Sequence, residues 1–385
     1  MNLAHSIQAL VSTKRTRVAL IGRISLLSDP GGDTIQIKMT CKYIKKEAPD
    51  ITVDFFPYSH ELLKKIDDYD IFHFFSVTDC CEYTPLMNRL RTSGKLIVLS
   101  PIHLDYSEFE RYGRGSISSK ILALLPPDTQ DYAKNIAKSL LGKKKISLEY
   151  IIKGQKKSVR NAISNADILL PNSYSELQRV ARVYSTSFPA KIVPNGIDEE
   201  IFTRLSCENL KDPDQIICVG RIEGRKNQLS LIKAALDLNK KLTIVGKPAK
   251  NQPGYYEKCL AISKGSRKIK FLEYVPQQEL AKLFQTSKVH ALPSWFETTG
   301  LVTLEAASQG CNIVVGDRGD VRDYFKDYAF YCNPADIESI AQAILAACNN
   351  TSHSQAQFSK QIFSDLTWRK AAEHTLAAYS NQYFI

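Results

Sequence analysis

Short apolar runs rich in β-branched residues recur along the chain, and each is followed by a longer stretch with apolar positions at helical spacing. Gly, Pro or Asn residues separate the two kinds of segment. This alternation is typical of βαβ units, in which helices connect parallel strands. Two series of strands are predicted, at 17–22, 51–56, 71–75, 96–100, 168–171 and 191–193 in the first half, and at 215–219, 241–245, 269–272, 289–292, 312–315 and 329–331 in the second.

A chain of 385 residues suits two α/β domains better than one core. The boundary is expected at Pro194-Asn195-Gly196, because Pro and an Asn-Gly pair interrupt regular elements. We therefore expect an N-terminal domain over 1–193, a C-terminal domain over 194–364 and a last helix over 365–385. Ligands bind beyond the carboxyl ends of open parallel sheets, so the two sheets are expected to face each other across a substrate cleft.

A first candidate for ligand binding is the segment Asp29-Pro30-Gly31-Gly32-Asp33-Thr34, which follows the first predicted strand and opens a helical pattern. Gly31 and Gly32 let the backbone approach an anion closely, and a helix N-terminus presents free N–H groups and the positive end of its dipole. A diphosphate would suit this place. A plain strand-to-helix turn explains the same residues equally well.

A second candidate is the loop over 220–227, directly after the first strand of the second series. Arg221 stands just past the strand and Lys226 opens the next helix, so the two cations can converge on one anion. A solvated basic loop is the alternative interpretation.

A third candidate is the segment over 293–305, which holds two carboxylates eight residues apart. Glu297 precedes a Thr-Thr-Gly turn, and Glu305 lies inside an apolar helix whose N-terminus can receive an anion. A carboxylate can bind vicinal hydroxyls such as a ribose diol. The alternative for Glu305 is an exposed helix position, but its apolar neighbours indicate a buried carboxylate that needs partners.

The second half resembles the nucleotide-binding domain of the GT-B type glycosyltransferases, specifically of glycosyltransferase family 4. The resemblance covers 193–231 and 269–320, with Glu297 and Glu305 as the family's Glu-x7-Glu motif and Arg221 and Lys226 as its Arg-Lys pair. It implies two Rossmann-like domains and a closing helix, here with Trp368, that crosses back to the N-terminal domain. In the first half of the chain, the resemblance to the family rests mainly on Gly31-Gly32.

The resemblance also implies a retaining, metal-independent transfer of a sugar from a nucleotide-diphosphate sugar, which is a donor substrate and not a cofactor. Arg221 and Lys226 would neutralise the donor diphosphate, Glu305 would hold the ribose, and Glu297 would contact the transferred sugar. The resemblance further assigns the backbone amides of Thr299, Gly300 and Leu301 to the donor, Tyr274 and Val275 to the edge of the base, and His103 to the sugar. A structural histidine in a loop is the alternative for His103.

Three features bear on this assignment. The family usually has Gly-Phe-Gly after its first Glu, whereas this chain has Thr298-Thr299-Gly300, so contacts to the sugar hydroxyls are expected to differ. Glu273 stands where a Gly often precedes the loop that borders the base. The sequence Asp68-Tyr69-Asp70 matches the metal motif of another glycosyltransferase fold, but it precedes a strand, and cationic side chains already supply the neutralisation, so no metal site is expected.

The chain has a formal charge of +11, and residues 132–160 hold nine Lys and Arg against Glu149 alone, a local balance of +8. Interleaved apolar residues make this region amphipathic, which favours an anionic membrane surface as a partner. A solvated helical face is the alternative. No recognition helix, zinc finger or aromatic RNA-binding pattern accompanies the charge, so nucleic acid is not expected as a partner.

Composition sets the expected compartment. No apolar run approaches the ~20 residues of a membrane span, and the start of the chain, at His5 and Ser6, lacks the order of a secretory signal. The nine cysteines show no C-x-x-C spacing and indicate a reducing environment. We therefore expect a cytoplasmic protein whose basic region lies at the inner face of the cell membrane.

Together these features predict a glycosyltransferase that acts on a hydroxyl of a glycan or lipid-linked glycan in surface polysaccharide synthesis. Two alternatives belong to other classes: a nucleotide-sugar-binding regulatory or scaffold protein without turnover, and an epimerase or phosphorylase of the GT-B type.

Overall fold

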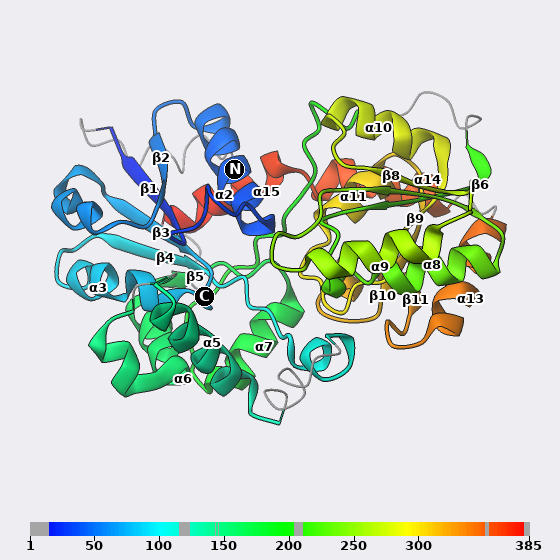
Figure 1. Cartoon of the computed structure of the whole chain (residues 1–385). Helices are drawn as coiled ribbons and strands as arrows, with labels where there is room; N and C mark the ends of the chain where they lie inside the picture. The colour runs from blue at the N-terminus through cyan, green and yellow to red at the C-terminus, as the bar shows by residue number, and fades with distance from the viewer. Residues whose placement is uncertain are drawn as a thin grey trace. The chain divides into compact units, whose positions relative to one another are not determined.

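The computed structural model describes residues 15–114, 124–142, 144, 146–203, 211–350 and 354–380. The chain divides into two compact units (Figure 1). The first unit comprises Met1–Leu104, Leu125–Asn195 and Trp368–Ile385, and the second comprises Asp105–Leu124 and Gly196–Thr367. Each unit contains one parallel sheet, as the alternating strands and helices of the sequence predict.

The sheet of the first unit has five strands in the order β2-β1-β3-β4-β5. The strands are β1 (Arg17–Gly22), β2 (Thr52–Pro57), β3 (Ile71–Phe75), β4 (Leu96–Ser100) and β5 (Ile168–Leu169). The strand order reverses between β1 and β3, and in open parallel sheets the loops after such strands form the usual place for a ligand.

One face of this sheet is covered by α2 (Gly32–Glu47), against which the last helix α15 (Trp368–Tyr379) packs. The Tyr379 hydroxyl lies 2.8 Å from Nδ1 of His73 in β3, and Nε2 of His73 lies 2.9 Å from Oγ of Ser100. Burial lowers the pKa of His73 to about 3, so it is a neutral, satisfied core residue. The predicted return of the last helix to the N-terminal domain is confirmed.

The other face of the first sheet carries α3 (Cys80–Leu90), α6 (Leu148–Asn165) and α7 (Tyr174–Tyr184), with α5 (Pro127–Leu140) packed on α6. Inward-facing residues of the strands, such as Phe72, Phe74 and Leu99, are fully buried against these helices. Their burial fits the apolar runs that predicted the strands.

The sheet of the second unit has six strands in the order β11-β10-β9-β6-β7-β8. The strands are β6 (Asp212–Val219), β7 (Lys241–Val245), β8 (Ile269–Leu272), β9 (Ser287–Leu292), β10 (Asn312–Gly316) and β11 (Ala329–Cys332). The reversal of order falls between β6 and β9, which are neighbours although about 70 residues separate their ends in sequence.

Two cores cover the two faces of this sheet. Helices α8 (Gln228–Asp237), α9 (Pro253–Ser263) and α13 (Ile337–Asn349) enclose one core, and α10 (Gln277–Thr286), α11 (Leu301–Ser308) and α14 (Ser354–Asp365) enclose the other. Lys211 closes the second core at its edge, because its ammonium donates to the carbonyls of Phe284, Gln285, Ser287 and Gln309 at 3.1–3.3 Å.

The predicted strand at 191–193 is wrong. Lys191 N donates to Leu169 O and Val193 N to Pro171 O, each at 2.9 Å, but only an isolated bridge between Leu169 and Ala190 forms. The next bond of a parallel ladder would run from the N–H of residue 171 to Lys191 O, and Pro171 has no N–H to donate, so the ladder stops after one bridge. The other predicted strands are present with small shifts of their ends.

Residues 105–124 group with the second unit, although they fall within the range expected for the N-terminal domain. The segment lies between β4 and α5 in sequence, and its described part packs on loops of the second unit. Among the described helices, none is both long and apolar enough to cross a membrane.

Candidate functional site

The predicted ligand-binding loops of the second half meet at the reversal point of its sheet. The loop over 220–227 follows β6 and the loop over 293–300 follows β9, and these strands are hydrogen-bonded neighbours. Parallel strands end at the same edge, so two segments that are distant in sequence come together beyond their carboxyl ends.

Hydrogen bonds join the two loops directly. Trp295 N donates to Arg225 O at 2.9 Å, and Nδ2 of Asn227 donates to Pro293 O at 3.2 Å. Asn227 has a left-handed backbone, with φ of 60°, and is buried. Asn is one of the few residues that tolerate this conformation, and here its side-chain amide supplies a hydrogen bond between the two loops.

A buried ion cluster lies across this junction. Nζ of Lys226 is 2.5 Å from Oε1 of Glu297, and a guanidinium nitrogen of Arg225 is 3.6 Å from the same oxygen. Arg225 also pairs with Glu223 at 2.9 Å. The side chains of Lys226 and Glu297 are only 13% and 11% exposed, so water screens their attraction little.

The cluster fixes the charge of its members. Burial opposes ionisation of Glu297, but Lys226 and Arg225 outweigh it and lower the pKa of the carboxyl. Burial lowers the pKa of the Lys226 ammonium, and Glu297 acts against that shift. Burial also disfavours the charged form of Arg225, but Glu297 and other neighbours raise its pKa above the usual value. We take Glu297 as an anion that holds two cations in place.

The backbone of Glu297 is held as well. Asp320 N donates to Glu297 O at 2.8 Å, and Gly319 forms a bridge with Glu297. A Cβ atom at Gly319 would overlap the Glu297 carbonyl, and the residue has φ of 78°. Gly319 therefore permits the loop after β10 to support the ion cluster.

Helix α11 begins beside this cluster. Gly300 precedes it with φ of 67° and ψ of 56°, a left-handed conformation that a glycine adopts without strain. Thr299 is buried and its hydroxyl donates to the Tyr324 hydroxyl at 3.2 Å, so its side chain faces the interior. The first-turn amides of a helix have no intrahelical acceptor, and those around Leu301 can receive an anion.

Glu305 lies inside α11, one turn beyond Leu301. Burial, with a smaller contribution from Asp198, raises the pKa of Glu305 to about 8. The side chain retains some exposure, and no cation of the described residues pairs with it in the structure. A half-buried carboxyl without a cationic partner is suited to bind hydroxyl groups.

The remaining predicted residues of this half border the same edge of the sheet. Arg221 follows β6 and is half-buried, and its carbonyl accepts from Gln228 Nε2 at 2.9 Å. Tyr274 is 74% exposed in the loop after β8, and Val275 packs against the core. Nζ of Lys247, which follows β7, lies 5.8 Å from the centre of the Tyr274 ring.

Arg225 was not predicted as a site residue, although it stands beside Lys226. The segment after β4, which packs on loops beside the ion cluster, was not predicted either. The Phe109 and Trp295 rings are 6.4 Å apart, and Arg318 binds Glu108 with two hydrogen bonds, one of them 2.8 Å long. The adjacent Arg225-Lys226 pair was a usable signal, whereas nothing in the sequence links Glu108 to Arg318.

The predicted residues of the first half lie in the first unit. The Gly31 N–H donates to Thr34 Oγ1 at 3.0 Å at the start of α2, so this amide is already engaged. Asp33 pairs with Arg23 at 2.7 Å. The carboxylates in this segment make it less suited to a diphosphate than the glycine pair alone indicated.

His103 is buried and is held by α7. Its Nδ1 accepts from Arg179 Nε at 3.2 Å, and its backbone N–H donates to Glu176 Oε1 at 2.7 Å. Arginine can only donate, so the neutral imidazole carries its proton on Nε2. Arg179 is therefore a residue that orients His103 and selects its tautomer.

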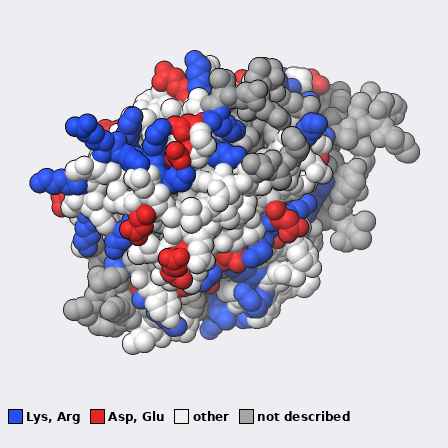
Figure 2. All heavy atoms as spheres, turned by 90° about the vertical axis from the view of Figure 1, so that its right-hand side faces the viewer, with Lys and Arg blue, Asp and Glu red and all other residues white. Residues whose placement is uncertain are grey.

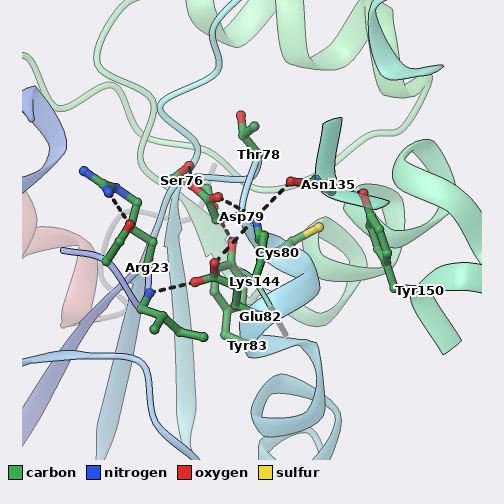
Figure 3. A network of polar contacts seen from close by, with 12 residues as sticks. Arg23, Ser76, Thr78, Asp79, Cys80, Glu82, Tyr83, Asn135, Lys144 and Tyr150 are labelled. Atoms are coloured by element: carbon green, nitrogen blue, oxygen red, sulfur yellow. Dashed lines mark hydrogen bonds and ion pairs between the residues drawn. The ribbon is translucent and has the colours of Figure 1, made fainter. Parts of the chain in front are cut away.

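A polar network occupies the reversal point of the first sheet (Figure 3). Nζ of Lys144 lies 2.8 Å from Asp79 Oδ1, 3.5 Å from Glu82 Oε1 and 3.0 Å from Asn135 Oδ1. Burial disfavours the charged Lys144, but the two carboxylates raise its pKa above the usual value. Lys144 thus neutralises carboxylates in the interior and does not belong to a solvated basic face.

The segment Asp68-Tyr69-Asp70, which matches a metal motif of another fold, does not gather its carboxylates around one point. Asp68 is exposed, and Oδ2 of Asp70 accepts from Arg17 N at 2.9 Å. Within the described ranges, no three His, Cys, Asp or Glu side chains are grouped so that they could hold a metal ion. The expectation of a metal-independent reaction stays a prediction.

The second unit matches a known protein family. The family described as Glycosyl transferases group 1 matches residues 204–364. This part of the chain is a group 1 glycosyltransferase domain. The matched residues contain the loops after β6 and β9 and helix α11, and therefore Lys226, Arg225, Glu297 and Glu305.

Curated relatives match over part of their length. An uncharacterised glycosyltransferase of Methanocaldococcus jannaschii is 26% identical over 54% of this chain and 58% of its own. The O-antigen chain mannosyltransferase B of Escherichia coli is 21% identical over 59% and 64%, respectively. A D-inositol 3-phosphate glycosyltransferase of Corynebacterium urealyticum is 26% identical over 56% and 57%. The alignments thus span about three fifths of these relatives.

Solved structures resemble nearly the whole chain. A sucrose-phosphate synthase of Thermosynechococcus elongatus superposes with a TM-score of 0.70 at 14% identity, covering 95% of this chain and 98% of its own. Anabaena HepE, solved with UDP and glucose, gives a TM-score of 0.66 at 14% identity over 95% and 100%. At this identity the likeness shows the fold alone, which is two Rossmann-like domains of the GT-B type. The group 1 match lies in the second of these domains.

Proposed function

We propose that this protein is a retaining glycosyltransferase that moves a sugar from a nucleotide-diphosphate sugar to a hydroxyl of a glycan or lipid-linked glycan. One observation carries the proposal: Lys226 and Arg225 converge on Glu297 at the reversal point of the group 1 domain, beside the start of α11. Cations and free helix amides at such a point are suited to a diphosphate.

The ion cluster explains how Lys226 would serve a diphosphate. An ammonium group has three N–H donors, and Glu297 uses one of them at 2.5 Å. The other donors are available to phosphate oxygens, with Arg221 approaching from the end of β6. Glu297 would thus orient Lys226 and also contact the transferred sugar, as the family resemblance implies.

Glu305 would hold the ribose of the donor. Its carboxyl is half-buried, its pKa is raised, and it lies one turn inside the helix whose first amides would meet the diphosphate. Binding a diol gives this carboxyl group the hydrogen bonds that burial otherwise denies it. Tyr274 and Val275 would border the base from the loop after β8.

The proposed chemistry follows from charge. The bond between the anomeric carbon and the diphosphate oxygen breaks, so negative charge grows on the diphosphate and positive charge on the carbon. The acceptor oxygen forms the new bond on the face that the diphosphate leaves, and its proton passes to the departing diphosphate. Preorganised cations lower this barrier, and removal of one such group typically costs ~10²–10³ in rate. His103, with its Nε2–H tautomer, would donate to a sugar hydroxyl.

The proposed acceptor class rests on similar proteins. One relative is an O-antigen chain mannosyltransferase, and one protein of similar structure is a lipopolysaccharide outer core galactosyltransferase. Both names concern surface glycans, and we extend that class to this chain, with a cytoplasmic protein acting at the inner membrane face in surface polysaccharide synthesis.

A panel of nucleotide-diphosphate sugars tests the proposal. One donor is expected to raise the melting temperature, because a ligand that binds only the folded state stabilises it by mass action. Transfer from the same labelled donor to a glycan acceptor, with product of unchanged anomeric configuration by NMR, completes the proof. Stabilisation without transfer to any acceptor would favour a binding protein, and conversion of the donor sugar without an acceptor would favour an epimerase.

A further inference from the structure

The chain's positive charge is unevenly divided. Residues 196–367 contain 21 Lys and Arg against 20 Asp and Glu, so nearly all of the +11 lies outside this range. On the face drawn in Figure 2, basic and acidic side chains both occur and are separated by uncharged surface. The excess belongs to the first unit, where α5 and α6 form a hairpin over 127–165.

The turn of this hairpin exposes large aliphatic side chains. Leu140 and Leu141 at the end of α5 are 84% and 69% exposed, and Leu148 and Ile152 in the first turns of α6 are 72% and 77% exposed. Leu148, Ile151 and Ile152 share one face of α6, because they are three and four residues apart. Five of the 16 large hydrophobic residues exposed in the described chain fall within 140–152, so this is a concentration and not scatter.

Lysines surround these residues. Lys138, Lys153, Lys156 and Lys157 are exposed, and the last two form no ion pair with another described residue. Lys143 and Lys145 also belong to the basic region predicted over 132–160, but both lie outside the described residues. Lys144 is the exception in the turn, because it points inward.

The inward Lys144 anchors the turn. It binds Asp79 and Glu82 at the start of α3 and Asn135 of α5 (Figure 3), and the Glu82 carboxylate in turn accepts from Ile24 N at 2.7 Å. Lys144 is therefore held against the loop after β3 and the start of α3. Helices α5 and α6 pack on each other and so present Leu140, Leu141 and Leu148 to solvent without the entropy loss that ordering on a partner would cost.

We propose that the α5–α6 hairpin is a docking surface for an anionic lipid bilayer. The exposed aliphatic side chains at the end of α5 and the start of α6 enter the boundary between headgroups and acyl chains, and the exposed lysines lie along the anionic headgroups. Aliphatic groups ringed by long cationic side chains match that boundary, since lysines keep their charge in the headgroup layer while their stems cover apolar surface. A protein partner is less well matched, because protein interfaces are depleted of lysine. This inference does not depend on the proposed reaction.

Vesicle flotation of the full chain tests it. The wild-type chain is expected to float with vesicles of phosphatidylcholine that contain about one third phosphatidylglycerol, to stay behind with pure phosphatidylcholine, and to dissociate as salt rises. The variants Leu140→Ser/Leu141→Ser and Lys156→Glu/Lys157→Glu should each lower recovery at least about tenfold. All changed side chains are exposed, and circular dichroism with thermal unfolding verifies that the variants fold.

A matched control removes one exposed leucine and reverses one exposed lysine elsewhere: Leu260→Ser/Lys264→Glu in the second unit should float like the wild type. Equal recovery on neutral and anionic vesicles, no recovery on either, or an equal loss in the control would overturn the proposal. Loss in the leucine pair without loss in the lysine pair would point to an uncharged partner. A concentration-dependent dimer that Leu140→Ser/Leu141→Ser converts to a monomer, with no flotation, would identify a second copy as the occupant instead.

Discussion

Glu305 offers a direct test of the site, because its ionisation is linked to stability. Burial raises the pKa of this carboxyl to about 8 in the folded chain, whereas the pKa of a Glu in the unfolded chain is near the usual value of 4.5. Between these values the folded state keeps a proton that the unfolded state has lost. The unfolding free energy must therefore fall as pH rises through this interval and level off above about pH 8.

The magnitude follows from the shift. Each pKa unit corresponds to ~1.36 kcal/mol, so the wild type should lose about 3 to 4 kcal/mol of stability between pH 5 and pH 9 through this one group. Glu305→Gln removes the titration while keeping a polar side chain of the same shape. In a unit of this size that difference corresponds to a melting temperature on the order of 10 °C higher for the variant at pH 9, and to nearly equal values at pH 5.

Thermal unfolding without ligand at pH 5, 7 and 9 measures this difference. Glu257→Gln, at an exposed position of α9, is the matched control and should follow the wild type at every pH. Addition of the donor gives a second, independent measurement. The donor should raise the melting temperature of the wild type, and Glu305→Ala should abolish this rise. If wild type and Glu305→Gln stay parallel from pH 5 to pH 9, the carboxyl is not buried as described. If Glu305→Ala responds to the donor like the wild type, the ribose does not bind there.

Three further outcomes are expected. Lys226→Met should lower kcat by about 10²–10³ and Lys264→Met, at an exposed position, should not change it; steady-state kinetics with the identified donor decide, and equal rates would remove Lys226 from the mechanism. Gly319→Ala should destabilise by about 2 kcal/mol or more in urea unfolding, because its Cβ would overlap the Glu297 carbonyl, whereas Gly254→Ala meets no atom within 4 Å and should stay within about 1 kcal/mol of the wild type; similar values for both would contradict the close approach. Lys211→Met should cost about 2 to 3 kcal/mol, since four carbonyls lose their ammonium partner, and an unchanged urea midpoint would show that the lysine is dispensable.

The elements of this protein are readable in its sequence because they depend on local patterns. Strands buried on both faces are mostly apolar along their whole length, so the apolar runs at β3 and β10 predict these strands directly. The loop positions of Lys226 and Glu297 follow from where those strands end. The failure at 191–193 is also local in origin, because Pro171, just after β5, lacks the N–H that would continue the ladder to Lys191.

The meeting of the two loops depends on strand order, which no local pattern contains. Lys226 and Glu297 are 71 residues apart, and they touch only because β6 and β9 are neighbours at the reversal point. The same geometry gives Arg225 a place on Glu297, although the sequence motif pointed to Arg221 and Lys226. Spatial neighbourhood is set by how helices cover the sheet, and that is a property of the whole unit.

Charge shows the same division. The sequence determines that 132–160 is strongly basic and amphipathic. Only the tertiary structure separates Lys144, buried between Asp79 and Glu82, from the exposed Lys156 and Lys157. It likewise places residues 105–124 with the second unit, through aromatic contacts and the pairing of Glu108 with Arg318. Residue types and their order fix what each segment can do, but burial and partners decide which of those possibilities a side chain realises, because both depend on residues distant in the chain.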